Sequence, residues 1–570
     1  MKYSFPSRTK AASIIILLLS LVLVTRLFFV QALHNASYSV QADHQYATPS
    51  SNIFERGTIF FSNKNGGAVS GAVQVAGYKL VINPTKIVNA ESVYTELSKK
   101  AIIDHEDFIK KASKANDPYE EVAHRLTANE ADTITKLKIP GVTLNKEKWR
   151  FYPGDNLAAH VLGFLGYQGN ELAGRYGLER QYDSVLAKSA DDPYINFFAE
   201  VFSNISNSFS KGEEENGSLV TTIEPSVQGF LEKKMLEVKD KYQSDSVGGI
   251  VMNPEDGSVY AAGVLPDFNL NDFSKVEDAS TFANPLVEGV FEFGSVVKPL
   301  VMAGALDAGV LTANTTYTDK GSVEVEKYTI YNFDKKARGP NISMQEVLSQ
   351  SLNTGMVFVE RKLGRVNLRN YLLSYGIKDK TGIDLPNETS GLVSGILTSP
   401  REIEYANASF GQGIAITPFE MVRALASLSN GGNLVVPHVV KAIKYDDGGV
   451  KEMTYPTKRV KISEQTAQEI TRMMVAAMDS YGSGQAKLPH YSIAAKTGTA
   501  QVPDHSTGGY YENRHIHSFV GFFPAYDPKF IVFLYAINPQ GVRYASETWT
   551  NPFLDISKFL LNYYEVPPDR

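Results

Sequence analysis

The longest apolar run of the chain lies near its start. Residues 11–30 are apolar except for two serines, Thr25 and Arg26. About 20 apolar residues are enough to cross a bilayer, and an arginine near one end can extend to the interface. Three basic residues precede the run, which favours a cytoplasmic N-terminus. The pattern predicts a membrane anchor over residues 11–33, a cytoplasmic tail over residues 1–10, and an extracytoplasmic location for the rest.

A cleaved signal peptide is the alternative interpretation of this run. Val30-Gln31-Ala32 is a passable cleavage triplet. The apolar part is long for a signal peptide, however, which favours an uncleaved anchor. No second apolar run is long enough to cross a bilayer, so the sequence predicts a single-pass protein of the cell membrane.

Residues 34–217 change their pattern several times. Residues 55–61 read as turn and strand, and residues 68–82 alternate weakly as further strands. Residues 84–146 are rich in charge and mostly helical in pattern. No nucleophile–base pair occurs in this region, so the pattern predicts a mixed α+β domain without a catalytic role.

Three charged residues of this domain, Arg56, Arg175 and Glu179, need an interpretation. Because no nucleophile accompanies them, we expect a structural ion-pair network and not a site. Residues 203–218 are rich in Ser, Asn, Gly and Glu, which is typical of a linker. The sequence therefore predicts a domain boundary between residues 217 and 218.

Residues 218–570 read as a second compact unit. Two apolar runs, 248–252 and 258–262, flank an Asp-Gly pair, which predicts a β-hairpin. Helices are expected from about residue 297 to residue 430. The later elements are predicted as strands over 492–501, 517–523 and 530–538 and an amphipathic helix over 551–564.

The composition excludes several classes of function. At 570 residues, with 43% hydrophobic and 21% charged residues, the chain is globular and has room for two to four domains. Its net charge of −6 argues against a nucleic-acid binder, which is usually basic. The absence of cysteine excludes disulfides, a cysteine nucleophile and thiolate metal sites.

The first stretch with candidate chemistry surrounds Ser295. Ser295 and Lys298 are spaced i, i+3 before a buried helix, so their side chains share one helix face. A lysine kept neutral by burial can take the proton of a serine hydroxyl. The free N–H groups at the helix start suit a developing oxyanion. Alone, a Ser-x-x-Lys pattern is weak, because an N-cap serine with a solvated lysine has the same spacing.

The second stretch is Ser351-Leu352-Asn353, between two predicted helices over 343–349 and 356–363. Ser351 could relay a proton in a cleft. The amide of Asn353 could donate to a substrate carbonyl and accept from an amide N–H. An ordinary turn is the alternative, since Ser and Asn favour turns in any case.

The third stretch is a predicted strand that contains Lys496, Thr497, Gly498 and Thr499. Strand periodicity places Lys496 and Gly498 on one face. If this face lines a cleft, the lysine supplies positive charge, the glycine lets substrate approach the backbone, and the strand edge can pair with an extended peptide. Thr497 can bond a substrate carboxylate. The alternative is a strand glycine that marks a bulge.

The three stretches together carry a resemblance to a family. Ser-x-x-Lys, a Ser-x-Asn element and Lys-Thr-Gly occur here in the order of the penicillin-binding protein and β-lactamase set. Nearly the whole chain resembles class B penicillin-binding proteins, which are monofunctional peptidoglycan transpeptidases. The likeness includes Arg56-Gly57-Thr58-Ile59, Gly411-Gln412-Gly413 and His517-Ser518-Phe519. One departure is Phe293, where the family usually has proline before Gly-Ser.

The resemblance implies a fold. It is an α/β (α+β) serine transpeptidase domain of the β-lactamase-like type, with an antiparallel sheet flanked by helices, over residues 218–570. An elongated α+β region of the pedestal or dimerisation type is expected over residues 34–217, after one transmembrane helix. No cofactor and no metal are expected.

The resemblance also implies roles for the site residues. The substrate is the D-Ala-D-Ala end of a peptidoglycan stem peptide, and Ser295 attacks its penultimate carbonyl. Lys298 is the base, and Ser351 passes the proton to the leaving amine. The other expected roles are carboxylate binding by Lys496 and Thr497, an oxyanion hole from the N–H groups of Ser295 and Thr499, and binding of the stem-peptide backbone by Asn353 beside Gly498.

Two other classes of function share these motifs: a β-lactamase, and a non-enzymatic sensor or scaffold. A membrane-anchored β-lactamase needs a group that activates water, and no Glu-x-x-Leu-Asn element lies between Asn353 and Lys496. A β-lactam sensor is expected to have several spans and a cytoplasmic effector, and a scaffold for wall assembly is a further non-enzymatic interpretation.

A zinc site is an alternative interpretation of the segment that contains Asp504, His505, His515 and His517. Histidines that bind no metal are commoner in loops and strands.

The resemblance finally implies partners. They are peptidoglycan stem peptides, β-lactams, the lipid bilayer through one helix, and a membrane glycosyltransferase within the divisome or elongasome. The overall length and the modest first region favour the division type over the elongation type.

Overall fold

The computed structural model describes residues 55–114, 116–168, 171–188, 216–484, 486–504 and 509–570, together with 17, 18, 20 and 21. Most of the predicted anchor, residues 11–33, lies outside these ranges. Within them, no helix is both long enough and apolar enough to span a membrane. The described chain divides into two units, one built mainly from residues 75–149 and one from residues 56–74, 150–188 and 211–570.

The smaller unit combines three strands with three α-helices and one short 3₁₀ helix. Its strands are the second half of β3 (Ala68–Ile82), β4 (Glu120–Leu126) and the first part of β5 (Val142–Phe151), and both β4 and β5 pair with β3. Its helices are η2 (Pro84–Lys86), α3 (Ala90–Ser98), α4 (His105–Ala112) and α5 (Ala128–Lys136). Leu80, Phe108 and Ile134 are among the buried side chains that join strands and helices into one core.

The prediction of a mostly helical segment over residues 84–146 is wrong for β4 and β5. Charged side chains dominate β4, which hides its strand pattern. The structure pairs these charges: Glu120 with Lys114, and Glu121 with Lys79. The helical part of the prediction is confirmed by α3, α4 and α5, and α5 begins at Thr127, which forms a capping box with Glu130.

A five-stranded antiparallel sheet forms the centre of the larger unit. Its strand order is β11-β10-β22-β21-β20. The strands are β10 (Ser246–Met252), β11 (Val259–Leu265), β20 (Ala494–Asp504), β21 (Gly509–Phe523) and β22 (Phe530–Ile537). The predicted hairpin and the three predicted C-terminal strands are therefore confirmed. Because β20 pairs only with β21 in the described sheet, its other edge is free.

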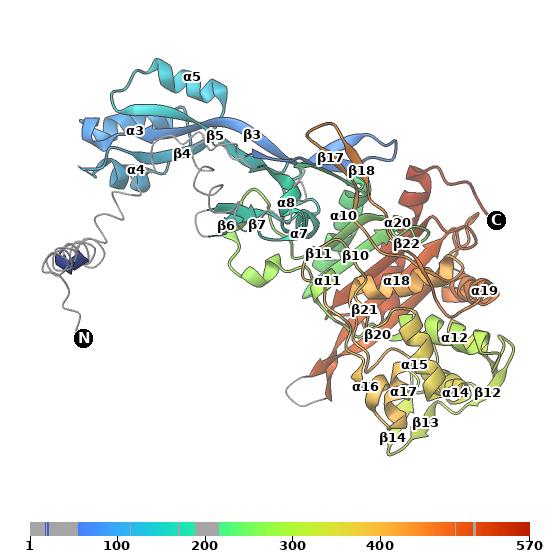
Figure 1. The fold of residues 1–570 in the computed structure, drawn as a ribbon. Coiled ribbons are helices and arrows are strands. Elements are labelled where there is room, and N and C mark those ends of the chain that lie inside the picture. Colours follow the sequence, from blue (N-terminus) through green and yellow to red (C-terminus); the bar gives the residue numbers. More distant parts are fainter. Residues whose placement is uncertain are drawn as a thin grey trace, which may run out of the picture. The chain divides into compact units, whose positions relative to one another are not determined.

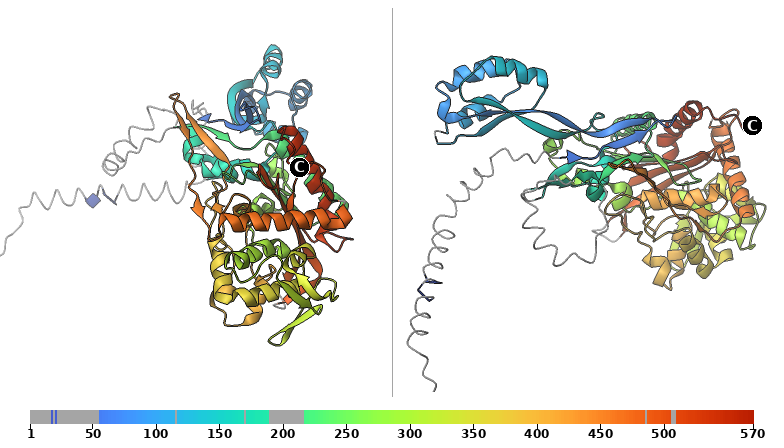
Figure 2. Two further views of the ribbon diagram at one scale, coloured as in Figure 1. Left: turned by 90° about the vertical axis from the view of Figure 1, so that its right-hand side faces the viewer. Right: turned by 45° about the horizontal axis from the view of Figure 1, so that its top comes forward.

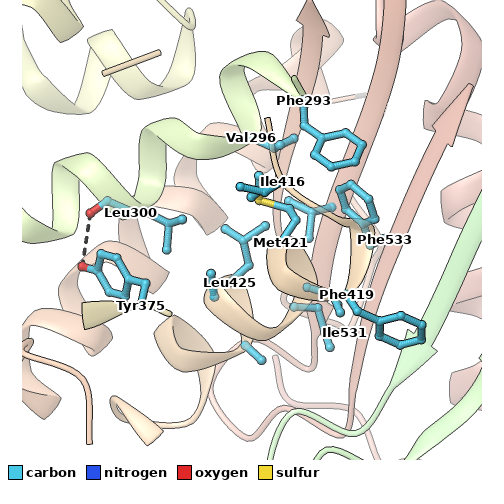
Figure 3. Close-up of a cluster of buried hydrophobic side chains, with 14 of the residues drawn as sticks. Phe293, Val296, Leu300, Tyr375, Ile416, Phe419, Met421, Leu425, Ile531 and Phe533 are labelled. Carbon is cyan, nitrogen blue, oxygen red and sulfur yellow. Dashed lines mark hydrogen bonds between the residues drawn. The ribbon is translucent and has the colours of Figure 1, made fainter. Parts of the chain in front are cut away.

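Helices cover both faces of this sheet, which confirms the predicted antiparallel sheet flanked by helices. Helices α10 (Pro225–Tyr242) and α20 (Ala545–Tyr563) pack on one face, where Trp549 and Phe553 are fully buried (Figures 1 and 2). Helices α12 (Lys298–Asp307) and α18 (Pro418–Ser429) pack on the other face. Figure 3 shows this second core, in which Val296 and Met421 lie close to Phe533.

Four short strands lie between α12 and the next helices: β12 (Thr316–Asp319), β13 (Ser322–Val325), β14 (Tyr328–Tyr331) and β15 (Gly339–Ser343). The predicted helices between about 297 and 430 are present, but the prediction did not include these strands. The helices of this part are α13 (Met344–Ser349), α14 (Asn353–Leu363), α15 (Arg365–Ser374), α16 (Ser394–Thr398) and α17 (Glu402–Ala408). After α18, helix α19 (Glu464–Ser480) leads toward β20.

The remaining elements of the larger unit are short. They include β2 (Ile59–Ser62), β9 (Gly217–Thr221), β17 (Val440–Tyr445) and β18 (Val450–Glu452), which extend a sheet through the first half of β3. The others are β1 (Glu55–Arg56), α6 (Ala159–Leu162), β6 (Leu165–Gln168), β7 (Glu171–Gly174), α7 (Gly177–Gln181), α8 (Asp183–Leu186), β8 (Ala187–Lys188), η3 (Phe273–Lys275), η4 (Ala279–Phe282), α11 (Pro285–Glu288), β16 (Asn433–Leu434), β19 (Lys458–Arg459) and η6 (Tyr481–Gly484).

A buried ion-pair network lies among these short elements. Glu179 is fully buried and binds Arg56 Nε and Arg150 Nε, each at 2.6 Å. Arg56 also binds Asp183 at 2.8 Å. The predicted network is therefore present, but Arg150 and not Arg175 is the second arginine on Glu179. Nothing in the local pattern distinguishes Arg150, the last residue but one of β5 and buried there, from the other arginines of this region.

Candidate active site

Ser295 lies in a tight turn that precedes α12. Residues Gly294–Val297 form a 3₁₀ turn (η5), and α12 begins at Lys298, with Pro299 in its first turn as the sequence predicted. A 3₁₀ turn has three residues per turn, so the side chains of Ser295 and Lys298 project on the same side. Ser295 is partly exposed, whereas Lys298 is fully buried. The turn thus presents a hydroxyl above a buried amine.

Close backbone contacts fix this turn. Gly294 has a φ of +63° and its N–H donates to Gly411 O at 3.2 Å. A Cβ at Gly411 would lie 2.0 Å from Gly294 O, so no other residue fits there. From the sheet side, Ser518 Oγ donates to Phe293 O at 2.8 Å. The nucleophile turn, residues 293–298, is therefore wedged between the Gly-Gln-Gly segment and β21.

Gly498 serves this same packing. A Cβ at Gly498 would lie 2.2 Å from Phe293 O and 2.4 Å from Ser518 Oγ. The missing side chain therefore makes room for the nucleophile turn. The sequence-based reason, an approach of substrate to the backbone at this face, needs correction on this point.

The amine of Lys298 is held by the second predicted stretch. Its Nζ donates to Ser351 O at 2.6 Å, to Asn353 Oδ1 at 2.8 Å and to Ser351 Oγ at 3.2 Å. In the described structure no hydrogen bond joins Lys298 Nζ to Ser295 Oγ. Catalytic hydrogen bonds are often long without substrate, and the chain of contacts already links the lysine to the Ser351 hydroxyl.

Burial shifts both lysines of the site toward their neutral forms. The pKa of Lys298 lies well below its usual value, first because the amine is desolvated and second because Lys496 is near. Burial also lowers the pKa of Lys496, to about 7. Three acceptors surround Lys298 Nζ, so an ammonium is accommodated too. Lys298 can therefore take up a proton and return it.

The Ser351–Asn353 segment is held by polar side chains. Ser351 has a φ of +55°, which is uncommon for a residue other than glycine. Asn353 is the first residue of α14, and its Nδ2 donates to Tyr331 O at 3.0 Å. Next to it, the buried Thr354 Oγ1 bonds Asp319 Oδ1 at 2.8 Å and Asn332 Oδ1 at 3.1 Å. Sequence reasoning missed this network, because Asp319 and Asn332 lie in hairpins that it did not predict.

Strand β20 brings the third stretch to the same place. Lys496 and Gly498 lie on the face of the nucleophile turn, and Lys496 Nζ donates to Thr497 O at 2.9 Å. Thr497 is partly exposed at the free edge. The side chain of Thr499 accepts from Ala545 N at 3.0 Å and so helps to cap α20. The described site thus gathers all three predicted stretches around the two lysines.

Two further residues beside the nucleophile turn were missed. Tyr510 of β21 donates its hydroxyl to the carboxylate of Glu292 at 3.0 Å. Burial raises the pKa of Glu292. A glutamate just before the Gly-Ser pair was the only available signal, and it does not identify a tyrosine more than two hundred residues away.

The histidines of β21 have other partners. His517 is buried, and its Nδ1 lies 2.8 Å from Thr548 Oγ1. Burial and the nearby His515 lower the pKa of His517 to about 4. No group of three metal-ligating side chains occurs in the part of the chain that the structure describes, and His505 lies outside it.

Comparison with known proteins identifies the family of the chain. The family profile "Penicillin binding protein transpeptidase domain" matches residues 247–557, and "Penicillin-binding Protein dimerisation domain" matches residues 54–217. The chain belongs to the penicillin-binding proteins. It is a serine transpeptidase of that family.

Curated relatives and solved structures extend the likeness over most of the chain. "Stage V sporulation protein D" of Bacillus subtilis is 29% identical over 91% of this chain and 80% of its own length. "Peptidoglycan D,D-transpeptidase FtsI" of Buchnera aphidicola is 26% identical over 98% of this chain and 95% of its own length. The structure of penicillin-binding protein 3 of Mycobacterium tuberculosis, complexed with aztreonam, has a TM-score of 0.68 at 22% identity and covers 91% of this chain and 98% of that chain. The last likeness concerns the fold alone.

Proposed function

We propose that this penicillin-binding protein is a peptidoglycan D,D-transpeptidase that crosslinks stem peptides through an acyl-Ser295 intermediate and is acylated by β-lactams. One observation carries the proposal. The fully buried Lys298, one turn below Ser295, donates to both Ser351 and Asn353. A nucleophile, a base and a proton relay thereby meet beside the free edge of β20. The names of the FtsI relative and of the aztreonam complex agree with this substrate and inhibitor class.

Acylation begins with the hydroxyl of Ser295. Neutral Lys298 takes its proton as Oγ attacks the penultimate D-Ala carbonyl. The proton then passes through Ser351 Oγ, which already accepts from Lys298 at 3.2 Å, to the leaving amine. The C–N bond breaks, terminal D-Ala departs, and an ester joins the stem peptide to Ser295.

Strand β20 binds and polarises the substrate in this proposal. Lys496 and Thr497 hold the terminal carboxylate, and a bound carboxylate favours the charged lysine. The backbone N–H groups of Ser295 and Thr499 receive the oxyanion. Asn353 binds the stem-peptide backbone by giving up its bond to Tyr331 O, while Gly498 keeps β20 close to the nucleophile.

A donor peptide that ends in D-Ala-D-Ala, offered together with an amine acceptor, tests the reaction. We expect release of D-Ala and a new amide between donor and acceptor, detected by mass spectrometry. A β-lactamase would instead hydrolyse nitrocefin in rapid, repeated turnover and form no amide. A sensor or scaffold would bind penicillin without releasing D-Ala, so either result would reject the proposal.

The cellular setting of the proposal is the division septum. The chain would be held in the cell membrane by a single anchor over residues 11–33, with the domain of residues 218–570 outside, and would act with a membrane glycosyltransferase. Its length and modest first region favour this role over wall elongation. A fluorescent fusion should gather at midcell in dividing cells, whereas a sidewall pattern would favour the elongation role.

A further inference from the structure

Residues 564–570, which follow α20, fold back along the segment 488–492 that leads into β20. The hydroxyl of Tyr491 donates to Val566 O at 2.8 Å. Further along, two successive backbone N–H groups both donate to His490 O, at 3.1 and 3.3 Å. We call residues 564–570 the returning segment. Its contacts connect the end of the sequence to the entry of the strand that carries the Lys-Thr-Gly motif.

Asp569 of the returning segment holds Ser492, which lies two residues before β20 begins. Ser492 N donates to Asp569 Oδ1 at 2.7 Å, and Ser492 Oγ donates to Oδ2 of the same carboxylate. Ser492 is 1% exposed, and both its O and its Oγ accept from Ala525 N at 3.0 Å. Since Ala525 follows the end of β21, Asp569 fixes the entry of β20 against the end of the neighbouring strand.

Arg570 fixes the other end of the same connection. Its guanidinium donates to the two carboxylate oxygens of Asp479, at 2.6 and 2.9 Å, and to Leu488 O at 3.1 Å. Asp479 lies in the last turn of α19. A bidentate arginine–carboxylate pair fixes orientation as well as distance. The returning segment therefore joins the end of α19 to the start of β20.

The start of β20 needs this support for two reasons. First, β20 pairs only with β21 in the described sheet, and the twist between two neighbouring strands is variable. Pairing on one side therefore fixes the register of β20 but not its twist. Second, His490 has a φ of +73°, which is uncommon for a residue other than glycine, so its own backbone preference does not hold the connection in place. Lys496 follows Ser492 by only four residues, so a change at the entry reaches it directly.

We propose that Asp569 and Arg570 are positioning residues for carboxylate binding: they hold both ends of the connection between α19 and β20, and so set the place of Lys496 and Thr497. This inference rests on the proposed role of Lys496 and Thr497 as ligands of the substrate carboxylate. The two residues act through Ser492 and the strand, without touching substrate. Their loss should weaken recognition of the carboxylate and spare the nucleophile turn, which is held by the Gly-Gln-Gly segment and β21.

Benzylpenicillin and its methyl ester, which lacks the carboxylate, test this inference in the full chain. In Asp569→Ala and in Arg570→Ala, the second-order rate constant for acylation by benzylpenicillin should fall about fivefold or more, within the roughly 100-fold that a 1 Å displacement can cost. Rates at several concentrations should place the fall in the dissociation constant of the first, noncovalent complex and not in the acylation step. The rate constant for the methyl ester should change by less than about twofold, because the ester makes no use of the displaced groups.

A conservative variant and a matched control complete the test. Asp569→Asn should restore the rate with benzylpenicillin, because its amide oxygen can accept from Ser492 N and its amide N–H can donate to Ser492 Oγ. Arg472→Ala is the control, since Arg472 makes the same kind of bidentate pair, with Glu469, two turns earlier on α19. It should react with both compounds like the unsubstituted chain.

Two results would overturn the positioning role. One is an equal loss with benzylpenicillin and its ester in both alanine variants, and the other is no loss with either compound. If the unsubstituted chain reacts equally fast with the acid and the ester, the proposed role of Lys496 and Thr497 is rejected instead, and this inference falls with it. Asp569 and Arg570 are both exposed, so we expect the alanine variants to fold, and their unfolding midpoints check this.

Discussion

The nucleophile turn, residues 293–298, and the Ser351–Asn353 segment meet at Lys298, yet different forces hold them. The turn is fixed by shape, since Gly294, Gly411 and Gly498 allow backbone atoms to approach closely. The segment is fixed by polar bonds, from Lys298 on one side and from Thr354 with Asp319 on the other. The two regions therefore have different roles. Packing positions Ser295 Oγ, and hydrogen bonds position Lys298 and Ser351, which transfer the proton.

The largest expected effect comes from Lys298→Met, which removes the amine that joins the two regions. Because the base is lost and Ser351 loses its donor, acylation by a fluorescent penicillin should fall by about 10³-fold or more. Stopped-flow or gel-based labelling measures the rate. Lys362→Met, at an exposed lysine of α14, is the control and should label normally. Labelling of Lys298→Met within tenfold of the unsubstituted rate would remove the lysine from the reaction.

A smaller effect is expected from Gly411→Ala, which tests whether shape fixes the turn. Its Cβ would lie 2.0 Å from Gly294 O, so the turn must move, and we expect labelling to fall by about 100-fold, the scale on which misplacing reacting atoms by about 1 Å acts. Gly413→Ala is a close control, since Gly413 also has a positive φ (+71°) but its nearest neighbour would be 3.9 Å away.

Both glycine variants pay the strain of a left-handed alanine, about 1–2 kcal/mol. Only Gly411→Ala adds the clash with Gly294 O. Both variants should therefore lose thermal stability, and the additional loss in Gly411→Ala measures the clash. If both variants label alike, packing against Gly411 does not position Ser295.

The smallest expected effect is a pH dependence of acylation. It should appear only with compounds that bind through a negatively charged carboxylate. Lys496 has a pKa of about 7, so above that pH it is increasingly neutral in the free enzyme. The second-order rate constant for benzylpenicillin should therefore fall by up to about tenfold per unit as pH rises above 7. Burial lowers the pKa of Lys298 as well, and raising the pH can only increase its neutral, base-competent form, so its titration cannot cause this fall. The methyl ester of benzylpenicillin lacks the carboxylate and should show no such fall, and parallel profiles for acid and ester would contradict the role of Lys496.

Local patterns were enough to predict the parts of the site that are continuous in sequence. The Asp-Gly turn identified the β10–β11 hairpin, and the three strands predicted near the C-terminus lie close to the observed β20, β21 and β22. The hairpin and the strands depend on neighbours in sequence, which is the information that a single chain provides. That Ser295, Ser351 and Lys496 share one site followed from the family resemblance carried by the motif order.

Features that depend on distant contacts were not predictable. The need for glycine at Gly498 comes from Phe293 O, and the side chain of Thr499 is occupied by Ala545 N. The strand β4 was hidden because its surface is charged, and the pairing of Glu121 with Lys79 is made only in the folded sheet. Which arginine joins Arg56 on Glu179 is likewise decided by the fold.

The most direct test of the central claim is the mass of the protein after reaction with benzylpenicillin. The unsubstituted chain should gain one penicilloyl group, and peptide mapping should place it on Ser295. Ser295→Ala should gain none while keeping its unfolding midpoint. An adduct on another residue, or an undiminished adduct in Ser295→Ala, would show that Ser295 is not the nucleophile.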